Sequence, residues 1–131
     1  VHTALLPFVE HIMNYEITKL DKRHSWHDQF QYMIEFKRAR DRTYFGSGFL
    51  NSTGVLEFDR SRRWFNETYG WSQDVETRAS IGKLNAKANE DYSKDFNVHW
   101  SYSIKYNEYR LYVNTDRELN WFVLTHPKTD V

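Results

Sequence analysis

The feature that most constrains the fold is a run of alternating residues in the last third of the chain, "VHWSYSIKY" at 98–106. Every second side chain is aromatic or aliphatic, and those between them are polar or charged. The apolar set is Val98, Trp100, Tyr102, Ile104 and Tyr106. A period of two residues is that of a β-strand, because successive side chains point to opposite faces of a sheet. Asn107-Glu108 then connects to "YRLYV" (109–113), so we predict a β-hairpin.

The same alternation recurs in the first third of the chain, at 15–18 and at 30–37. The polar segment "DKRHSWHD" (21–28) lies between the two and predicts a long hairpin turn. After the basic "KRARDR" we expect another strand in "TYFGSGFL" (43–50), whose glycines mark a bulge or a close backbone approach. The turn residues "NSTG" then lead into a short apolar segment, "VLEF" (55–58).

Residues 59–69 are predicted to form a helix. Asp59 or Ser61 can cap its start, and Gly70 stands where a left-handed residue closes a helix. The segment that follows, 72–97, is polar and has few apolar anchors. It predicts a loop or a loosely packed helical segment.

Two more helices are predicted near the ends of the chain. Thr115 and Glu118, three residues apart, have the form of a capping box, and apolar residues at helical spacing follow until Pro127 stops the helix. Near the N-terminus, apolar residues at helical spacing predict a short helix with Pro7 in its first turn. Alternatively, residues 1–12 are a loosely attached leader.

These elements share one chain of 131 residues, 40% of them hydrophobic and 18% aromatic, which is enough to bury a core built largely from rings. No repeat or linker divides the sequence, so we expect a single domain, 1–131. The order of strands and helices predicts an α+β fold in which helices pack on one face of an antiparallel sheet. A ferredoxin-like arrangement is one topology that satisfies this order.

Composition excludes several classes of function. The chain has no cysteine, which rules out disulfides, thiolate metal sites and cysteine nucleophiles. The formal net charge is zero, so nothing draws the whole chain to a phosphate backbone or an anionic membrane. No apolar run approaches the roughly 20 residues that span a bilayer, and the opening residues do not read as a signal peptide. We therefore expect a cytoplasmic protein without a membrane partner.

A local basic patch lies in residues 37–63, which hold seven basic and three acidic side chains, a net charge of +4. Cations that pair with phosphate, beside rings that stack on bases, favour single-stranded nucleic acid. A solvated helix face and a charged loop explain the same residues, and they are the more common origin of such a run of charges. The nucleic-acid hypothesis assigns a binding role to Lys37, Arg38, Arg40, Arg42, Tyr44, Phe45, Arg60, Arg62 and Arg63.

Two weaker patterns suggest metal chemistry. Glu35 and Lys37 resemble the E-x-K element of restriction-type nucleases, which bind a divalent metal with a second carboxylate. Strand rise places Asp28 about 23 Å from Glu35, and Asp21 pairs near the turn, so neither completes the site. Glu10 and Glu16 are the alternative partners, and neither has the spacing of that family. The histidines of "HSWH" (24–27) are spaced like metal ligands but lack further ligands. We predict no metal, no cofactor and no enzymatic activity.

Rings outside a single apolar face point to protein interaction. Trp26 lies in a polar turn, and Tyr109 and Tyr112 place rings on both faces of the predicted hairpin. Tyr and Trp are enriched at interfaces, although such rings also cap the edge of a core. We assign these three residues to an interface with a protein partner or a second copy of the chain.

The ending "YRLYVNTDRELNWFVLTHP" (109–127) is a strand, a capped turn and a short aromatic helix. It resembles the ends of small accessory proteins of tailed phages, over about the last fifth of the chain. The resemblance implies an accessory or structural role in a bacterial host cytoplasm or in the virion, and it assigns no functional residue. Our first expectation is a non-enzymatic binding or structural protein that acts through protein contact or self-association. Nucleic-acid binding comes second, and a metal-dependent nuclease third.

Overall fold

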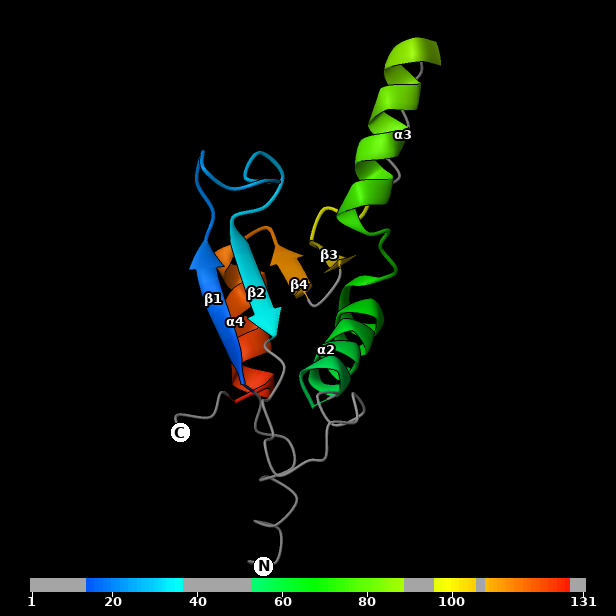
Figure 1. Ribbon diagram of the computed structural model, residues 1–131. Helices are drawn as coiled ribbons and strands as arrows, with labels where there is room; N and C mark the ends of the chain where they lie inside the picture. The colour runs from blue at the N-terminus through cyan, green and yellow to red at the C-terminus, as the bar shows by residue number, and fades with distance from the viewer. Residues whose placement is uncertain (1–13, 37–52, 89–95, 106–107, 128–131) are drawn as a thin grey trace, which may run out of the picture.

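The computed structural model describes residues 14–36, 53–88, 96–105 and 108–127. Four strands form one antiparallel sheet in the order β1-β2-β4-β3, and three helices pack against it (Figure 1). The α+β class is therefore as predicted. The elements in chain order are β1 (Tyr15–Lys19), β2 (Tyr32–Phe36), α2 (Thr53–Tyr69), α3 (Val75–Ala88), β3 (Trp100–Lys105), β4 (Glu108–Val113) and α4 (Asp116–Thr125).

The sheet consists of two hairpins placed side by side. β1 pairs with β2, β3 pairs with β4, and the inner strands β2 and β4 join the hairpins with Ile34 opposite Leu111. Both predicted hairpins are confirmed, although Lys105 pairs with Glu108, so the second connection lies one residue earlier than expected. Because α2 and α3 lie between the hairpins rather than within β-α-β units, the topology differs from the ferredoxin-like arrangement.

The main core lies between the sheet and the helices α2 and α4. Ile34 and Leu111 are fully buried at its centre. The ring of Phe65 from α2 stacks on Trp100 of β3 and on Phe122 of α4, with centroids 5.4 Å apart in both pairs. Stacked rings of this kind bury large apolar areas, which is how a chain with few aliphatic residues fills a core. The cluster also contains Tyr15, Phe36, Phe58 and Val113.

The opposite face of the sheet holds a second, smaller cluster. It consists of Leu20, Phe30, Met33, Val75 and Tyr112. The first turn of α3 covers this face beside β3, where Ser101 Oγ donates to the Gln73 carbonyl oxygen at 2.5 Å and Ser103 Oγ donates to the Glu76 carboxylate at 3.2 Å. Helices α2 and α4 therefore cover one face of the sheet, as expected, and the start of α3 packs on the other, where hydrogen bonds satisfy the buried serines.

Helix α2 begins at Thr53 and not at Asp59 or Ser61. The segment "VLEF" is its second turn. Phe58 and Phe65 are seven residues apart, which places both rings on one face of the helix, and each is at most 2% exposed. The turn residues before this segment predicted a helix that begins later, but the packing of Phe58 against the sheet favours a helix from Thr53.

The end of α2 is as predicted. Gly70 has a φ of 94°, the left-handed conformation that closes a helix, and its N–H donates to the Asn66 carbonyl oxygen at 3.0 Å. The side-chain amide of Asn97 donates to the carbonyl oxygens of Tyr69, Gly70 and Trp71 at 2.9, 3.1 and 3.2 Å. This one side chain satisfies carbonyl groups that a helix end leaves without partners and fixes the path of the chain after it.

Helix α3 shows that the polar segment is helical and loosely packed. Asp74 caps it by accepting a hydrogen bond from the Thr77 N–H at 2.8 Å. Of residues 75–84, whose exposure the structure describes, only Val75 and Arg78 are buried. Figure 1 shows α3 running outward from the sheet beyond its first turns. The helix is therefore held at its N-terminal end.

Arg78 is the polar anchor of α3. Its guanidinium donates to Ser72 Oγ at 2.9 Å and to the carbonyl oxygens of Trp100, at 3.1 Å, and Asn97. The same group lies over the ring of Phe30, 5.2 Å from its centroid. Burial lowers the pKa of Arg78 to about 10, so the side chain stays charged at neutral pH.

Helix α4 follows the predicted capping box, with Thr115 at the cap and Glu118 three residues on. None of the helices among the described residues is long and apolar enough to cross a membrane. Several expectations fall outside those residues. These are the N-terminal helix or leader at 1–12, the strand at 43–50 and the site residues Lys37, Arg38, Arg40, Arg42, Tyr44 and Phe45.

Candidate functional site

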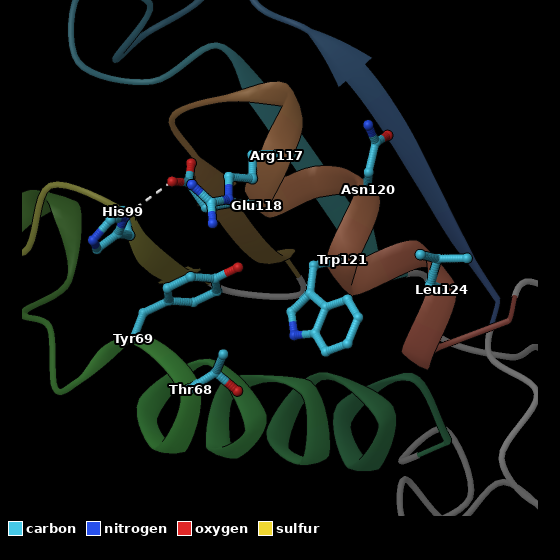
Figure 2. A pocket seen from close by; sticks show the side chains of 8 residues that line it. All are labelled: Thr68, Tyr69, His99, Arg117, Glu118, Asn120, Trp121 and Leu124. Atoms are coloured by element: carbon cyan, nitrogen blue, oxygen red, sulfur yellow. Dashed lines mark hydrogen bonds and ion pairs between the residues drawn. The ribbon is translucent and has the colours of Figure 1, made fainter.

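A wide hollow lies between the C-terminal part of α2 and the outer face of α4. Its volume is about 980 Å³, within the range of sites that bind ligands or peptide side chains. Figure 2 shows Trp121 projecting from α4 toward α2, with Tyr69 and Thr68 on the facing side and His99 at one end. We call this hollow the α2–α4 groove. Its lining residues are Thr68, Tyr69, His99, Arg117, Glu118, Asn120, Trp121 and Leu124.

Large apolar side chains are exposed in the α2–α4 groove. Trp121 is 50% exposed and Leu124 is 73% exposed. They lie three residues apart, on the side of α4 turned away from the buried Phe122. Helix α4 therefore has two apolar faces, and only the inner one packs against described residues of the sheet core.

A buried carboxylate organises the other end of the groove. Glu118 Oε1 accepts hydrogen bonds from the Thr115 N–H and hydroxyl at 2.7 and 2.8 Å, which is the capping interaction. Glu118 Oε2 lies 2.9 Å from His99 Nδ1. The carboxylate places the hydrogen of the imidazole on Nδ1 and fixes the ring plane. One side chain thus caps α4 and orients His99, the residue directly before β3.

Tyr69 forms the wall opposite Trp121. Its ring packs against the His99 imidazole with centroids 5.1 Å apart. Burial and then the negative charge of Glu118 raise the pKa of Tyr69, while the positive charge of Arg117 lowers it by a smaller amount. The phenol therefore keeps its proton at neutral pH and can donate a hydrogen bond into the groove.

The chemistry of the groove suits recognition. The groove combines two rings, an exposed aliphatic side chain, a cation and fixed hydrogen-bonding groups, which is the composition of an interaction surface.

A second hollow, of about 200 Å³, lies on the other side of α2, and we call it the Trp71 pocket. It contains two of the predicted nucleic-acid residues, Arg62 and Arg63. Each makes an ion pair with Asp59 at 3.2 Å, and the Arg62 guanidinium lies 5.0 Å above the centre of the Tyr102 ring. The pocket is lined by Arg62, Arg63, Asn66, Trp71, Ser72, Trp100 and Tyr102.

Arg60, the third predicted arginine of α2, lies in a different place. It lines a hollow with Trp64, Glu67 and His126, and Arg63 reaches both hollows. Arg60 and Arg62 are two positions apart in the sequence, which is about 200° around a helix. The structure therefore joins Arg62 and Arg63 to an exposed tryptophan and places Arg60 apart from it.

The three residues predicted for an interface pack against the domain itself. Tyr112 is 2% exposed and belongs to the second core cluster. Tyr109 packs against Phe58, with centroids 5.5 Å apart, and Trp26 packs against the second cluster with a φ of 69° in the β1–β2 turn. The Tyr112 ring is therefore not exposed on the surface of a single chain, because the other side chains of the second cluster pack around it.

Three exposed apolar residues of these hollows were not predicted as site residues from the sequence: Trp121, Leu124 and Trp71. A signal for the first two is present in "DRELNWFVLT" (116–125), whose apolar residues are too many for one helix face. Trp71 follows the predicted closing glycine, so it lies outside helix α2 and is not part of its buried face.

The carboxylates of the nuclease pattern are engaged in the sheet. Glu35 Oε2 accepts from Arg110 Nε at 3.0 Å, and Glu16 lies opposite Glu35 on β1. His24 Nδ1 lies 3.0 Å from Asp21 and serves the β1–β2 turn. In the described ranges, no three His, Asp or Glu side chains come together as a group that could hold a metal ion. Lys37 lies outside those ranges.

No protein-family model, no curated protein and no solved structure matches this chain. Evidence for what it binds therefore comes from its own side chains. The strongest is the pair of exposed tryptophans, Trp121 and Trp71, with the cations and hydrogen-bonding groups around each.

Proposed function

We propose that this chain is a non-enzymatic binding protein that holds a partner protein in the α2–α4 groove. The observation that carries the proposal is the exposure of Trp121 and Leu124 on a hollow of about 980 Å³. A large apolar residue beside a hollow is the usual form of an interface anchor, and tryptophan is the residue most enriched among such anchors.

Arg117 adds a preference in charge. It lies in the first turn of α4, between Asp116 and Glu118. The helix dipole favours the two carboxylates there and disfavours a cation, so Arg117 does not stabilise the helix. Its exposed side chain lines the groove. We infer that the partner presents apolar side chains to Trp121 and Leu124 and a carboxylate to Arg117.

The resemblance of residues 109–127 to the ends of tailed-phage accessory proteins includes the whole of α4. On that basis we propose an accessory or structural role, with the partner in a bacterial host cytoplasm or in the virion. The partner in this proposal is a different protein; a second copy of the chain is the other occupant that the test distinguishes.

The test is site-specific photo-cross-linking in the cells that naturally contain the protein. A photoreactive amino acid at position 124 should give a discrete adduct, and the same group at Leu84, which is 62% exposed on α3, should not. The adduct identifies the occupant. Its affinity, measured with purified proteins, should fall about 30-fold for Trp121→Ala, as expected for a tryptophan anchor.

Equal adducts from positions 124 and 84, or an unchanged affinity of Trp121→Ala, would exclude the groove as the binding surface. Sedimentation at high micromolar concentration separates the two occupants. A dimer that Trp121→Ala returns to monomer identifies a second copy, and a monomer with a discrete adduct identifies a different protein.

A further inference from the structure

We propose that the Trp71 pocket binds single-stranded nucleic acid, with one base stacked on Trp71 and the neighbouring phosphate held by Arg62 and Arg63. This surface lies on the other side of α2 from the α2–α4 groove, so the inference goes beyond the proposed function and does not depend on it.

Trp71 is exposed on a backbone that is held in place. Its side chain is 69% exposed. The amide of Asn97 donates to the Trp71 carbonyl oxygen at 3.2 Å, and the indole N–H of Trp100 donates to the carbonyl oxygen of the preceding Gly70 at 2.8 Å. The next residue, Ser72, is buried and bonded to the Trp100 carbonyl oxygen. A ring presented to solvent on a fixed backbone is what a stacking platform for a base requires.

The cations beside Trp71 keep a positive charge. Arg62 and Arg63 share the single carboxylate of Asp59, so the three side chains together carry one net positive charge. The Arg63 side chain is 69% exposed, and the Arg62 guanidinium lies over the Tyr102 ring. A planar guanidinium binds two phosphate oxygens at once, which makes arginine the residue suited to this contact.

The size and surroundings of the pocket limit what it can take. Its volume of about 200 Å³ is below the range of pockets that enclose a whole ligand, and it fits one base of a longer chain. Asn66, an exposed amide on the same face of α2, can donate to or accept from the edge of that base. Bases in a duplex are stacked on each other and cannot reach such a ring, so the ligand is single-stranded.

Acidic residues set the direction of the strand. An adjoining hollow, which shares Arg62 and Tyr102 with the Trp71 pocket, is also lined by Asp74, Glu76 and Lys105. These three charged side chains together carry one net negative charge, which disfavours phosphate on that side. The backbone of the nucleic acid therefore leaves the pocket on the side of Arg63.

The test is fluorescence anisotropy of a labelled single-stranded oligonucleotide of about 12 nucleotides, a length within the site sizes of such proteins. The full chain should bind it in low salt, and a duplex of the same length more weakly. Trp71→Ala should weaken binding about tenfold or more, and Trp71→Phe, which keeps a ring, should weaken it less. Arg63→Ala should reduce the slope of log affinity against log salt by about 0.7.

Matched controls separate this surface from the α2–α4 groove. Trp121→Ala removes another exposed tryptophan, 50% exposed against 69% for Trp71, and Arg23→Ala removes an arginine whose side chain is 83% exposed in the β1–β2 turn. Both should leave affinity for the oligonucleotide unchanged. The proposal is overturned if Trp71→Ala binds as tightly as the unaltered chain, if both tryptophan variants lose affinity equally, or if no binding occurs in low salt. A photoreactive group at position 71 that captures a protein and no oligonucleotide would also overturn it.

Discussion

Replacement of Glu118 by alanine should lower the free energy of unfolding by about 2 kcal/mol. Loss of the capping interaction with Thr115 accounts for about 1 kcal/mol. A hydrogen bond to a charged group is worth about 1.5–3 kcal/mol. We expect the bond between Glu118 and His99 to contribute about 1 kcal/mol, less than that range, because the His99 side chain is 45% exposed and solvent screens the pair.

Glu118→Gln separates the two contributions. Glutamine also serves at this position of a capping box, so this variant keeps the cap and loses the negative charge that faces His99. It should cost about 1 kcal/mol. A double-mutant cycle of Glu118→Gln with His99→Ala should give a coupling of about 1 kcal/mol. Glu67→Ala, which removes an exposed glutamate from α2, is the control and should change stability by less than about 0.5 kcal/mol.

The assay is urea unfolding followed by circular dichroism, with the slope against urea unchanged among the variants. The reasoning fails if Glu118→Ala changes the free energy of unfolding by less than about 0.5 kcal/mol. Equal losses for Glu118→Gln and Glu118→Ala would show that the cap adds nothing and that the negative charge alone matters.

Three more variants test other parts of the structure by the same unfolding assay. Gly70→Ala should destabilise the protein by about 1 kcal/mol because of the φ of 94°. Gly82→Ala, in open space on α3, should stabilise it by about 0.5–1 kcal/mol. Changes of the same sign in the free energy of unfolding would refute the role of φ. Arg78→Ala should cost about 3 kcal/mol because buried acceptors lose their donor, and a loss below about 1 kcal/mol would contradict this. Burial raises the pKa of Tyr15 to about 12. The folded state therefore holds a proton that the unfolded chain loses near pH 10. As a result, about 2–3 kcal/mol of stability is lost as the pH rises through 12. Tyr15→Phe should remove that part of the alkaline loss, and an unchanged pH profile would refute the assignment.

Much of the fold could be predicted because its signals are local. The period of two in 98–106 fixes a strand whatever surrounds it, since alternate side chains always point to opposite faces. The box formed by Thr115 and Glu118 and the left-handed Gly70 act within one turn of their helices. Each of these was correctly located, because the atoms involved are only a few residues apart in the chain.

The errors lie where distant residues decide. Helix α2 begins at Thr53 because Phe58 packs against strands that are remote in sequence, and its turn residues yield to that packing. Ser101 and Ser103 occupy the polar positions of the alternation, and they are buried under α3, where the Gln73 carbonyl oxygen and the Glu76 carboxylate accept their hydrogen bonds.

The candidate site shows the same division. The sequence by itself determined that Arg62 and Arg63 lie together on one helix, that a capped helix follows the hairpin, and that rings must build the core. Only the tertiary structure decided that Tyr112 is buried while Trp121 and Trp71 face solvent. The reason is physical: a ring is equally apolar in either place, and its exposure depends on which elements pack over it, which no local pattern encodes.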